Sequence, residues 1–333
     1  MHPILIGPIH TFGVMVLLGV LAGLWWVRRE APRLKLDPEE VASLAVEVFL
    51  AGLIGSRLQF VLHNWDLYAE RGWWRVLAIW EGGLVWYGGF IAATVVAIWR
   101  MRHYRFPILR TCDLLAPATM IGLGIGRIGC LMAGDDHGRM ILLEEHVQQV
   151  LATKGPAWWE LHNPVVMDHI PWYALTFTDE NALVGPGYLG VPLLPSQPLM
   201  TIKCLTIAGL LIALRRPLMR APGALAAMLF VLYPIGRFLI EFTRGDLVRG
   251  VYSIGGMTLS TSQLISVLVL PPALLAFGVL YVRGRREWDR LVAEGKDPLA
   301  LEGQAPAKPA PTDEGSKTTA PAGEGAGSAQ EAT

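Results

Sequence analysis

The chain has 333 residues, of which 53% are hydrophobic and 17% are charged, and its formal net charge is zero. In soluble domains about a quarter of all residues are charged. No basic tract in this chain is long enough to bind a nucleic acid backbone. The composition therefore argues against a soluble protein and against nucleic acid as a partner. The three cysteines form no CxxC pair, so neither a disulfide framework nor a zinc site is expected.

The apolar residues are grouped in blocks, each about long enough to cross the roughly 30 Å of hydrocarbon in a bilayer as a helix. The first block has no cleavage site after it and is interpreted as a retained helix, not a signal peptide. The sequence thus predicts an all-α polytopic membrane protein of about seven transmembrane helices, over residues 11–27, 41–62, 82–99, 113–133, 199–214, 224–242 and 263–282.

Basic residues are concentrated after every second predicted helix, beginning with the first. The positive-inside rule places these connections in the cytoplasm. The N-terminus is therefore expected outside the cytoplasm and the C-terminus inside. The residues concerned are Arg28, Arg29, Arg33, Lys35, Arg100, Arg102, Arg105, Arg110, Arg215, Arg216, Arg220, Arg283, Arg285 and Arg286.

The domain organisation follows from the same pattern. Residues 1–283 form the transmembrane domain, and the insertion 134–198, rich in Gly, Pro and aromatic residues, is expected to form a small extracytoplasmic head. Residues 284–302 are expected to form a cytoplasmic helix or extension. Residues 303–333 lack large apolar side chains and are predicted to be disordered.

Charged residues inside predicted spans are costly and mark candidate functional sites. They include Arg57, Arg127 and a set on the sixth helix, Arg237, Glu241 and Arg244, whose i, i+4, i+7 spacing puts them on one face. The surplus of guanidinium groups suits a phosphate, and phospholipid headgroups are the phosphates at that depth. The alternative is a structural network of ion pairs at the membrane interface.

Two further patterns have simpler interpretations. Gly124-x-Gly126-x-x-Gly129 matches a dinucleotide fingerprint, but no strand precedes it. Close approach to the backbone, by another helix or by lipid, is expected instead. The run 135–137, Asp-Asp-His, resembles a metal cluster, but adjacent residues point in different directions and spacing places no second ligand group. We expect neither a metal nor a cofactor.

The run 126–139, GRIGCLMAGDDHGR, resembles the signature GRxGNFxNxExxGR of the bacterial prolipoprotein diacylglyceryl transferases. Further similar elements occur in order over about residues 4–282: EGGLVWYGGF, PSQ at 195–197 and YPIGRFLIEFTRGD. The resemblance implies an enzyme of the bacterial inner membrane. Such an enzyme moves the diacylglyceryl group of phosphatidylglycerol onto the lipobox cysteine thiol of a prolipoprotein signal peptide and releases glycerol phosphate. Its partners are these two substrates and membrane lipids.

The resemblance also assigns roles by motif position. It implies catalytic roles for Arg127, Arg237, Tyr87, Asp135 and Glu241. It implies substrate binding by Arg127, Gly138, Tyr233, Arg244, Arg57 and Gln197, and leaves His137 as an alternative base.

The sequence departs from the signature at several positions. Tyr87 stands where the family has His, Cys130 and Ala133 where it has Asn, and Asp135 where it has Glu. A histidine is a better base than tyrosine near neutral pH. Two alternatives therefore stay open: a divergent paralogue acting on or binding another lipid or acceptor, and an anion transporter. No inverted repeat supports the transporter.

Overall fold

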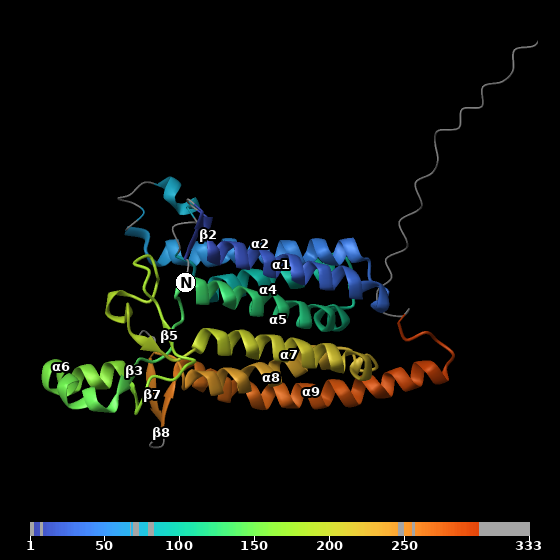
Figure 1. Ribbon diagram of the computed structural model, residues 1–333. Helices are drawn as coiled ribbons and strands as arrows, with labels where there is room; N and C mark the ends of the chain where they lie inside the picture. Colours follow the sequence, from blue (N-terminus) through green and yellow to red (C-terminus); the bar gives the residue numbers. More distant parts are fainter. Residues whose placement is uncertain are drawn as a thin grey trace, which may run out of the picture.

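The computed structural model describes residues 3–6, 9–66, 68, 73–78, 83–245, 250–254 and 257–299. Its long helices run side by side along one axis (Figure 1). They are α1 (Thr11–Glu30), α2 (Pro38–His63), α4 (Trp86–His103), α5 (Ile108–Ala133), α7 (Ser196–Leu218), α8 (Ala224–Glu241) and α9 (Thr261–Ala293).

Six of the described helices are long and apolar enough to cross a membrane: α1 with the short η1 (Ala31–Leu34) that follows it, α2, α5, α7, α8 and α9. The helix at the third predicted span, α4, ends in Arg100, Arg102 and His103, and it packs against α2. Large apolar side chains cover the outer surface of the bundle; Ile54 is 66% exposed and Leu268 64%. Such a surface is stable only in lipid, so the chain is a polytopic, all-α membrane protein.

Glycines let several helix pairs approach closely. A Cβ at Gly19 of α1 would lie 2.6 Å from the carbonyl oxygen of Gly122 in α5, and one at Gly55 of α2 would lie 2.5 Å from that of Gly88 in α4. Gly124, from the fingerprint-like pattern, faces Leu205 of α7 in the same way, at 2.7 Å. Small residues at membrane helix interfaces serve this purpose. The packing interpretation of the pattern holds for Gly124 and Gly129, whereas nothing lies within 4 Å of a Cβ at Gly126.

The last helix differs in extent from the predicted one. It runs unbroken from Thr261 to Ala293, so the predicted span 263–282 and much of the extension predicted over 284–302 form one helix. A capping box between Ser260 and Gln263 stabilises its start. The tail predicted to be disordered lies outside the described residues.

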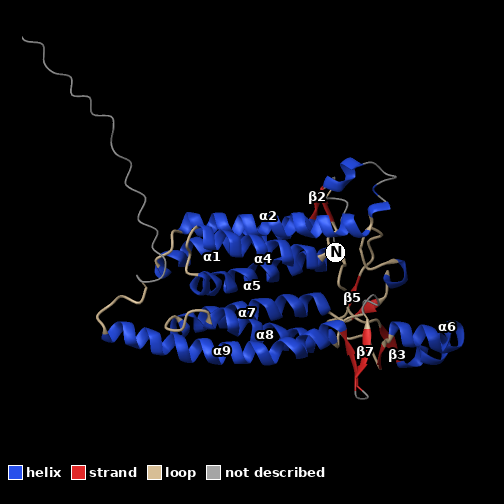
Figure 2. Ribbon diagram, turned by 180° about the vertical axis from the view of Figure 1, so that it is seen from behind, coloured by secondary structure: helices blue, strands red, loops and turns tan. Residues whose placement is uncertain are grey.

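The insertion 134–198 projects beyond one end of the bundle, at the left in Figure 1 and the right in Figure 2. It has a core of Met140, Phe177, Val184 and Leu193. It contains α6 (Val147–His162), a parallel pair β3 (Ile141–Leu143) and β4 (Val165–Met167), and an antiparallel pair β5 (Leu175–Thr176) and β6 (Pro192–Leu193), with the short helices η4 (Glu144–His146) and η5 (Pro186–Tyr188).

The same end of the bundle carries the remaining short elements. The hairpin of β7 (Val251–Ile254) and β8 (Met257–Ser260) leads into α9, and the antiparallel β1 (Ile4–Ile6) and β2 (Ile9–His10) lead into α1. The short helix η2 (Trp73–Leu77) follows α2. The opposite end holds the basic connections between α4 and α5 and between α7 and α8, as well as the end of α9.

Candidate active site

The site begins where α5 ends and the chain turns back on itself. Gly134 caps the helix in the left-handed conformation, φ 80°, and its N–H donates to the carbonyl of Cys130 at 2.9 Å. Asp136 is also left-handed, φ 55°. The turn returns the Asp136 carboxylate to Arg127, on the last turns of α5, and both Arg127 and Arg244 donate to it. Asp136 therefore holds together two arginines from different parts of the chain.

A second ion pair lies on α8. Arg237 and Glu241 are 2.8 Å apart, the pairing expected from their i, i+4 spacing. Arg237 also donates to the Ser262 hydroxyl at 2.9 Å, and Glu241 accepts from the Ser260 hydroxyl at 2.7 Å. The start of α9 thus fixes the orientation of both charged groups.

Lys203 of α7 lies near the arginines of both ion pairs. Its Nζ lies 4.2 Å from the centre of the Tyr233 ring of α8. Its charge is near those of Arg127, Arg237 and Arg244. The close approach depends on Gly236, where a Cβ would lie 2.7 Å from the Lys203 stem. Helices α5, α7 and α8, with the segment that follows α8 and carries Arg244, therefore bring four cations to one region.

Backbone hydrogen bonds around Gly138 hold the signature loop in place. Gly138 forms a β-bridge with Arg244, the Arg139 N–H donates to the Thr243 carbonyl at 2.9 Å, and the Leu194 N–H donates to the Arg139 carbonyl at 2.9 Å. A Cβ at Gly138 would lie only 2.0 Å from the Leu194 carbonyl oxygen. Only glycine fits where these three segments meet.

Gln197 ties the start of α7 to the same loop. Its side chain is completely buried, and its amide donates to the Asp135 carbonyl at 3.0 Å. Its Oε1 has no hydrogen-bond partner among the described residues. Beside it, the Ser196 hydroxyl donates to the Thr243 carbonyl at 2.7 Å. Ser196 and Gln197 of the PSQ element therefore hold the start of α7 against the signature loop and the segment after α8.

A cavity of about 830 Å³ lies between α1, α2, α4 and α5. Most of its lining is apolar and runs along α1, from Phe12 to Val27, and along α5, from Leu115 to Cys130. Arg127, Cys130, Asp135 and Asp136 line it as well. A cavity with apolar walls and a cationic group suits an amphipathic anion, whose apolar part is buried while its charge is paired.

The two neighbouring aspartates have opposite properties. Burial alone would raise the pKa of Asp136, but the charges of Arg244 and Arg127 outweigh it and hold that pKa at about 2. Partial desolvation, with the negative charge of Asp136, raises the pKa of Asp135. Asp136 is therefore a permanent anion, and Asp135 is the more basic carboxylate.

The two candidate bases, Tyr87 and His137, have other neighbours than the arginines of the cationic cluster. Tyr87 is 53% exposed and packs edge-on against Trp86, and it does not line the cavity in the described part of the chain. His137 is buried, with its Nδ1 2.9 Å from the Gly138 carbonyl oxygen and its ring 4.3 Å from that of Tyr188. Neither ring is in contact with Arg127 or Arg237 in the interactions described.

Arg57 lies away from the cluster and binds the backbone. It is 5% exposed and donates to the carbonyls of Arg75, Val76 and Gly83 at 2.7, 2.9 and 3.3 Å. These contacts hold the segment around η2 against α2. These contacts favour a structural role for Arg57, in line with the alternative that charged side chains near helix ends form interface networks.

We expect Arg57→Met to destabilise the protein, because the three carbonyl acceptors lose a shared donor that the apolar chain cannot replace. The loss should be about 2–4 kcal/mol, which lowers the midpoint of thermal unfolding in detergent by about 5 °C or more. Arg102→Met, at an exposed position, is the matched control. Equal midpoints for the two variants would contradict the structural role.

Sequence reasoning missed two members of the cluster, Asp136 and Lys203. The sequence does not assign Asp136 to the site, because only the left-handed turn shows that it, and not Asp135, carries both arginine contacts. Lys203 was detectable: it lies inside the predicted span 199–214, and the rule that singled out Arg127 applies to it equally.

Fold and site together define a class: a polytopic membrane protein with a cationic, carboxylate-braced centre beside an apolar cavity. The family model described as Prolipoprotein diacylglyceryl transferase matches residues 3–280. The chain belongs to the prolipoprotein diacylglyceryl transferase family, which confirms the resemblance seen in the signature.

Several relatives share most of the chain's length, and each bears the name phosphatidylglycerol–prolipoprotein diacylglyceryl transferase. The relative from Gloeobacter violaceus is 27% identical over 259 residues, 78% of this chain and 84% of its own. That from Streptococcus uberis is 26% identical over 283 residues, covering 84% and 93%. That from Geobacter sulfurreducens is 27% identical over 254 residues, covering 73% and 83%.

Proposed function

We propose that this protein transfers the diacylglyceryl group of phosphatidylglycerol to the lipobox cysteine thiol of prolipoproteins, in the inner membrane of a bacterium. The observation that carries the proposal is the convergence of four cations, Arg127, Arg237, Arg244 and Lys203, of which Arg127 lines an apolar cavity. Relatives spanning nearly the whole chain are named for these two substrates.

The proposed orientation has the N-terminus and the insertion outside the cytoplasm and the C-terminus inside. In its support, the basic connections lie at the end of the bundle opposite the insertion (Figure 1). The cationic cluster lies at the insertion end, which is the side from which a secreted prolipoprotein presents its cysteine.

In the proposed reaction, the cysteine sulfur attacks the glyceryl carbon bonded to the phosphate oxygen. The new C–S bond forms as that C–O bond breaks, and glycerol phosphate leaves with the bonding electrons. Negative charge grows on the departing phosphate. Fixed guanidinium groups in a water-poor site stabilise such a charge more than water does. We assign this role to Arg127 and Arg237, with Asp136 and Glu241 holding them in position.

The thiol proton needs an acceptor, and we assign it to Asp135. Neighbouring carboxylates with pKa values pushed apart take different roles. Asp136, held by two arginines, is a poor base, whereas Asp135 has a raised pKa, lines the cavity and accepts only the Asp136 N–H at 2.8 Å among its described side-chain hydrogen bonds. Asp135 also occupies the position of the signature Glu.

Asp135→Asn is therefore expected to lower kcat/KM by about 10²-fold or more, the usual contribution of a general base. The wild-type rate should fall as the pH drops through the raised pKa of Asp135, because the carboxylate becomes protonated. The pairs of Asp136 persist to about pH 2 and do not interfere. Asp135→Glu should retain the acidic limb and much of the rate. A pH profile of Asp135→Asn identical to that of the wild type would contradict the assignment.

The function itself is tested with purified protein, phosphatidylglycerol and a lipobox peptide, with detection of the thioether product by mass spectrometry. A peptide with serine in place of the cysteine is the control. In parallel, the gene should restore growth to a strain depleted of its own transferase. Well-folded protein that gives neither product nor rescue would favour the paralogue, and anion uptake into proteoliposomes would favour a transporter.

A further inference from the structure

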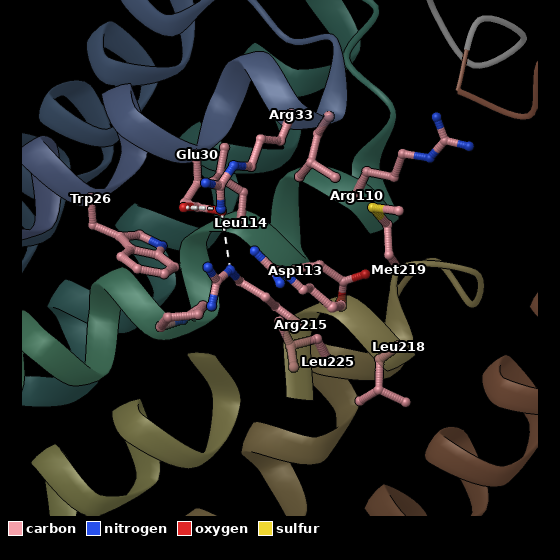
Figure 3. A pocket seen from close by; sticks show the side chains of 13 residues that line it. Trp26, Glu30, Arg33, Arg110, Asp113, Leu114, Arg215, Leu218, Met219 and Leu225 are labelled. Carbon is pink, nitrogen blue, oxygen red and sulfur yellow. Dashed lines mark hydrogen bonds and ion pairs between the residues drawn. The ribbon is translucent and has the colours of Figure 1, made fainter. Parts of the chain in front are cut away.

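A second cavity, of about 510 Å³, lies at the end of the bundle opposite the insertion (Figure 1). Figure 3 shows the side chains that line it. It is enclosed by the end of α1 with η1, the start of α5, the end of α7 and the start of α8. One part of its wall is apolar or aromatic: Trp26, Leu34, Leu114, Pro117, Leu218, Met219 and Leu225. The rest is charged: Glu30, Arg33, Arg110, Asp113, Arg215 and Arg216.

Both carboxylates in the lining have partners already. Glu30 pairs with Arg33 at 2.8 Å and with Arg215 at 3.2 Å. Asp113 accepts the backbone N–H groups of Gly223 and Ala226 at 2.7 and 2.8 Å, and so caps the start of α8. The acidic groups therefore leave part of the positive charge of the lining uncompensated.

The surplus charge comes from Arg216, because Arg110 lies near Asp113 and Asp297. Arg110 donates to the backbone carbonyls of Pro298 and Leu299, and its guanidinium is turned away from Glu30 and Arg215 in Figure 3. Arg216 has no carboxylate within ion-pair distance among the described residues. With Arg33 and Arg215 alongside, Arg216 makes the cavity a site for an anion.

A buried donor points to the same ligand. Trp26 is 6% exposed, and its indole Nε1 has no hydrogen-bond partner in the described part of the chain. The ring lies beside Glu30 and Arg215 in Figure 3, with the Arg215 guanidinium 5.6 Å from its centre. A buried N–H without an acceptor costs free energy, and an anionic oxygen would satisfy it.

We propose that this cavity binds the phosphate headgroup of an anionic phospholipid from the leaflet opposite the candidate active site. Arg33, Arg215 and Arg216 would surround the phosphate, and the Trp26 N–H would donate to one of its oxygens. The leucines and Pro117 would contact the glycerol and the first acyl carbons. These apolar walls at a helix-bundle end favour a lipid over free phosphate. The proposal does not depend on diacylglyceryl transfer.

The test uses the full chain, delipidated in detergent, and native mass spectrometry to count bound phosphatidylglycerol during a titration. The pocket variant is Trp26→Phe with Arg216→Gln, which keeps the ring beside Arg215. The matched control is Trp25→Phe with Arg220→Gln: Trp25 is 58% exposed, and neither residue lines the cavity. Phosphatidylcholine with the same acyl chains and free glycerol phosphate are the two comparison ligands.

We expect the pocket variant to bind one phosphatidylglycerol fewer, with an affinity for that lipid about tenfold lower, as for loss of charge-assisted hydrogen bonds. The control should bind like the wild type. Equal lipid counts in the two variants would overturn the site. Equally tight binding of phosphatidylcholine would overturn its anion selectivity, and equal binding of free glycerol phosphate would overturn the lipid assignment.

Transfer rates keep this result separate from the proposed function. The pocket variant and its control should transfer the diacylglyceryl group at equal rates, since neither touches the candidate active site. Loss of lipid binding in the pocket variant remains measurable even if no variant shows transfer. Unfolding midpoints without added lipid should agree between the two variants, which excludes misfolding as the cause of lost binding.

Discussion

Arg127→Ala should lower the rate of diacylglyceryl transfer by about 10²–10³-fold, the usual effect of removing one fixed donor to a developing anion. Arg127 lines the cavity and contacts Cys130, with 3.8 Å from Nη1 to Sγ. The fold should survive, because Asp136 keeps its contact with Arg244. The measurement is the turnover of phosphatidylglycerol with a lipobox peptide.

Three further variants test how Arg127 acts. Arg127→Lys keeps the charge but loses the planar fork, so it should recover only part of the rate. Arg220→Ala, an exposed arginine at the far end of the bundle, should leave the rate unchanged. Arg237→Ala should cause a loss comparable to that of Arg127→Ala. Wild-type turnover in both Arg127→Ala and Arg237→Ala, at normal protein levels, would contradict the assignment of these arginines to phosphate binding.

Gly138→Ala should abolish transfer, or prevent accumulation of folded protein. An added methyl group would lie 2.0 Å from the Leu194 carbonyl oxygen, which is backbone and cannot rotate away as a side chain does. Relief requires separating the signature loop from the segment before α7 or from the segment after α8. Either movement displaces Arg244 from Asp136. Such overpacking commonly costs about 1–3 kcal/mol or more.

Gly209→Ala is the matched control, since nothing lies within 4 Å of a Cβ there and α7 is helical at this position. It should be neutral or slightly stabilising. Protein level, unfolding midpoint and transfer rate are measured for both variants. A Gly138→Ala protein with wild-type stability and turnover would show that the three segments need not meet so closely.

The features that can be predicted well from the sequence are those that depend on neighbouring residues. The spans follow from runs of apolar residues, and the pairing of Arg237 with Glu241 follows from one helical turn. Lys203 follows from the same reasoning, once a charge inside an apolar run is noticed. Each of these needs only a few neighbouring residues and the geometry of an α-helix.

The partners of Arg127 required more than local pattern. Nothing in the spacing distinguishes Asp135 from Asp136, because the left-handed conformations at Gly134 and Asp136 decide which carboxylate faces back toward α5. The place of Tyr87 was equally hidden: its motif position implied a base, whereas the helix packing leaves it half exposed beside Trp86. For Arg57, carbonyls from a distant segment decide the role.

The sequence alone determined that this chain is a helical membrane protein of the diacylglyceryl transferase family, and it identified most of the charged residues of the site. The tertiary structure decided which carboxylate holds which arginine, and it revealed the second cavity. The reason is physical. Partition into lipid depends on the composition of each segment, whereas ion pairs and cavities depend on where separate helices and turns meet.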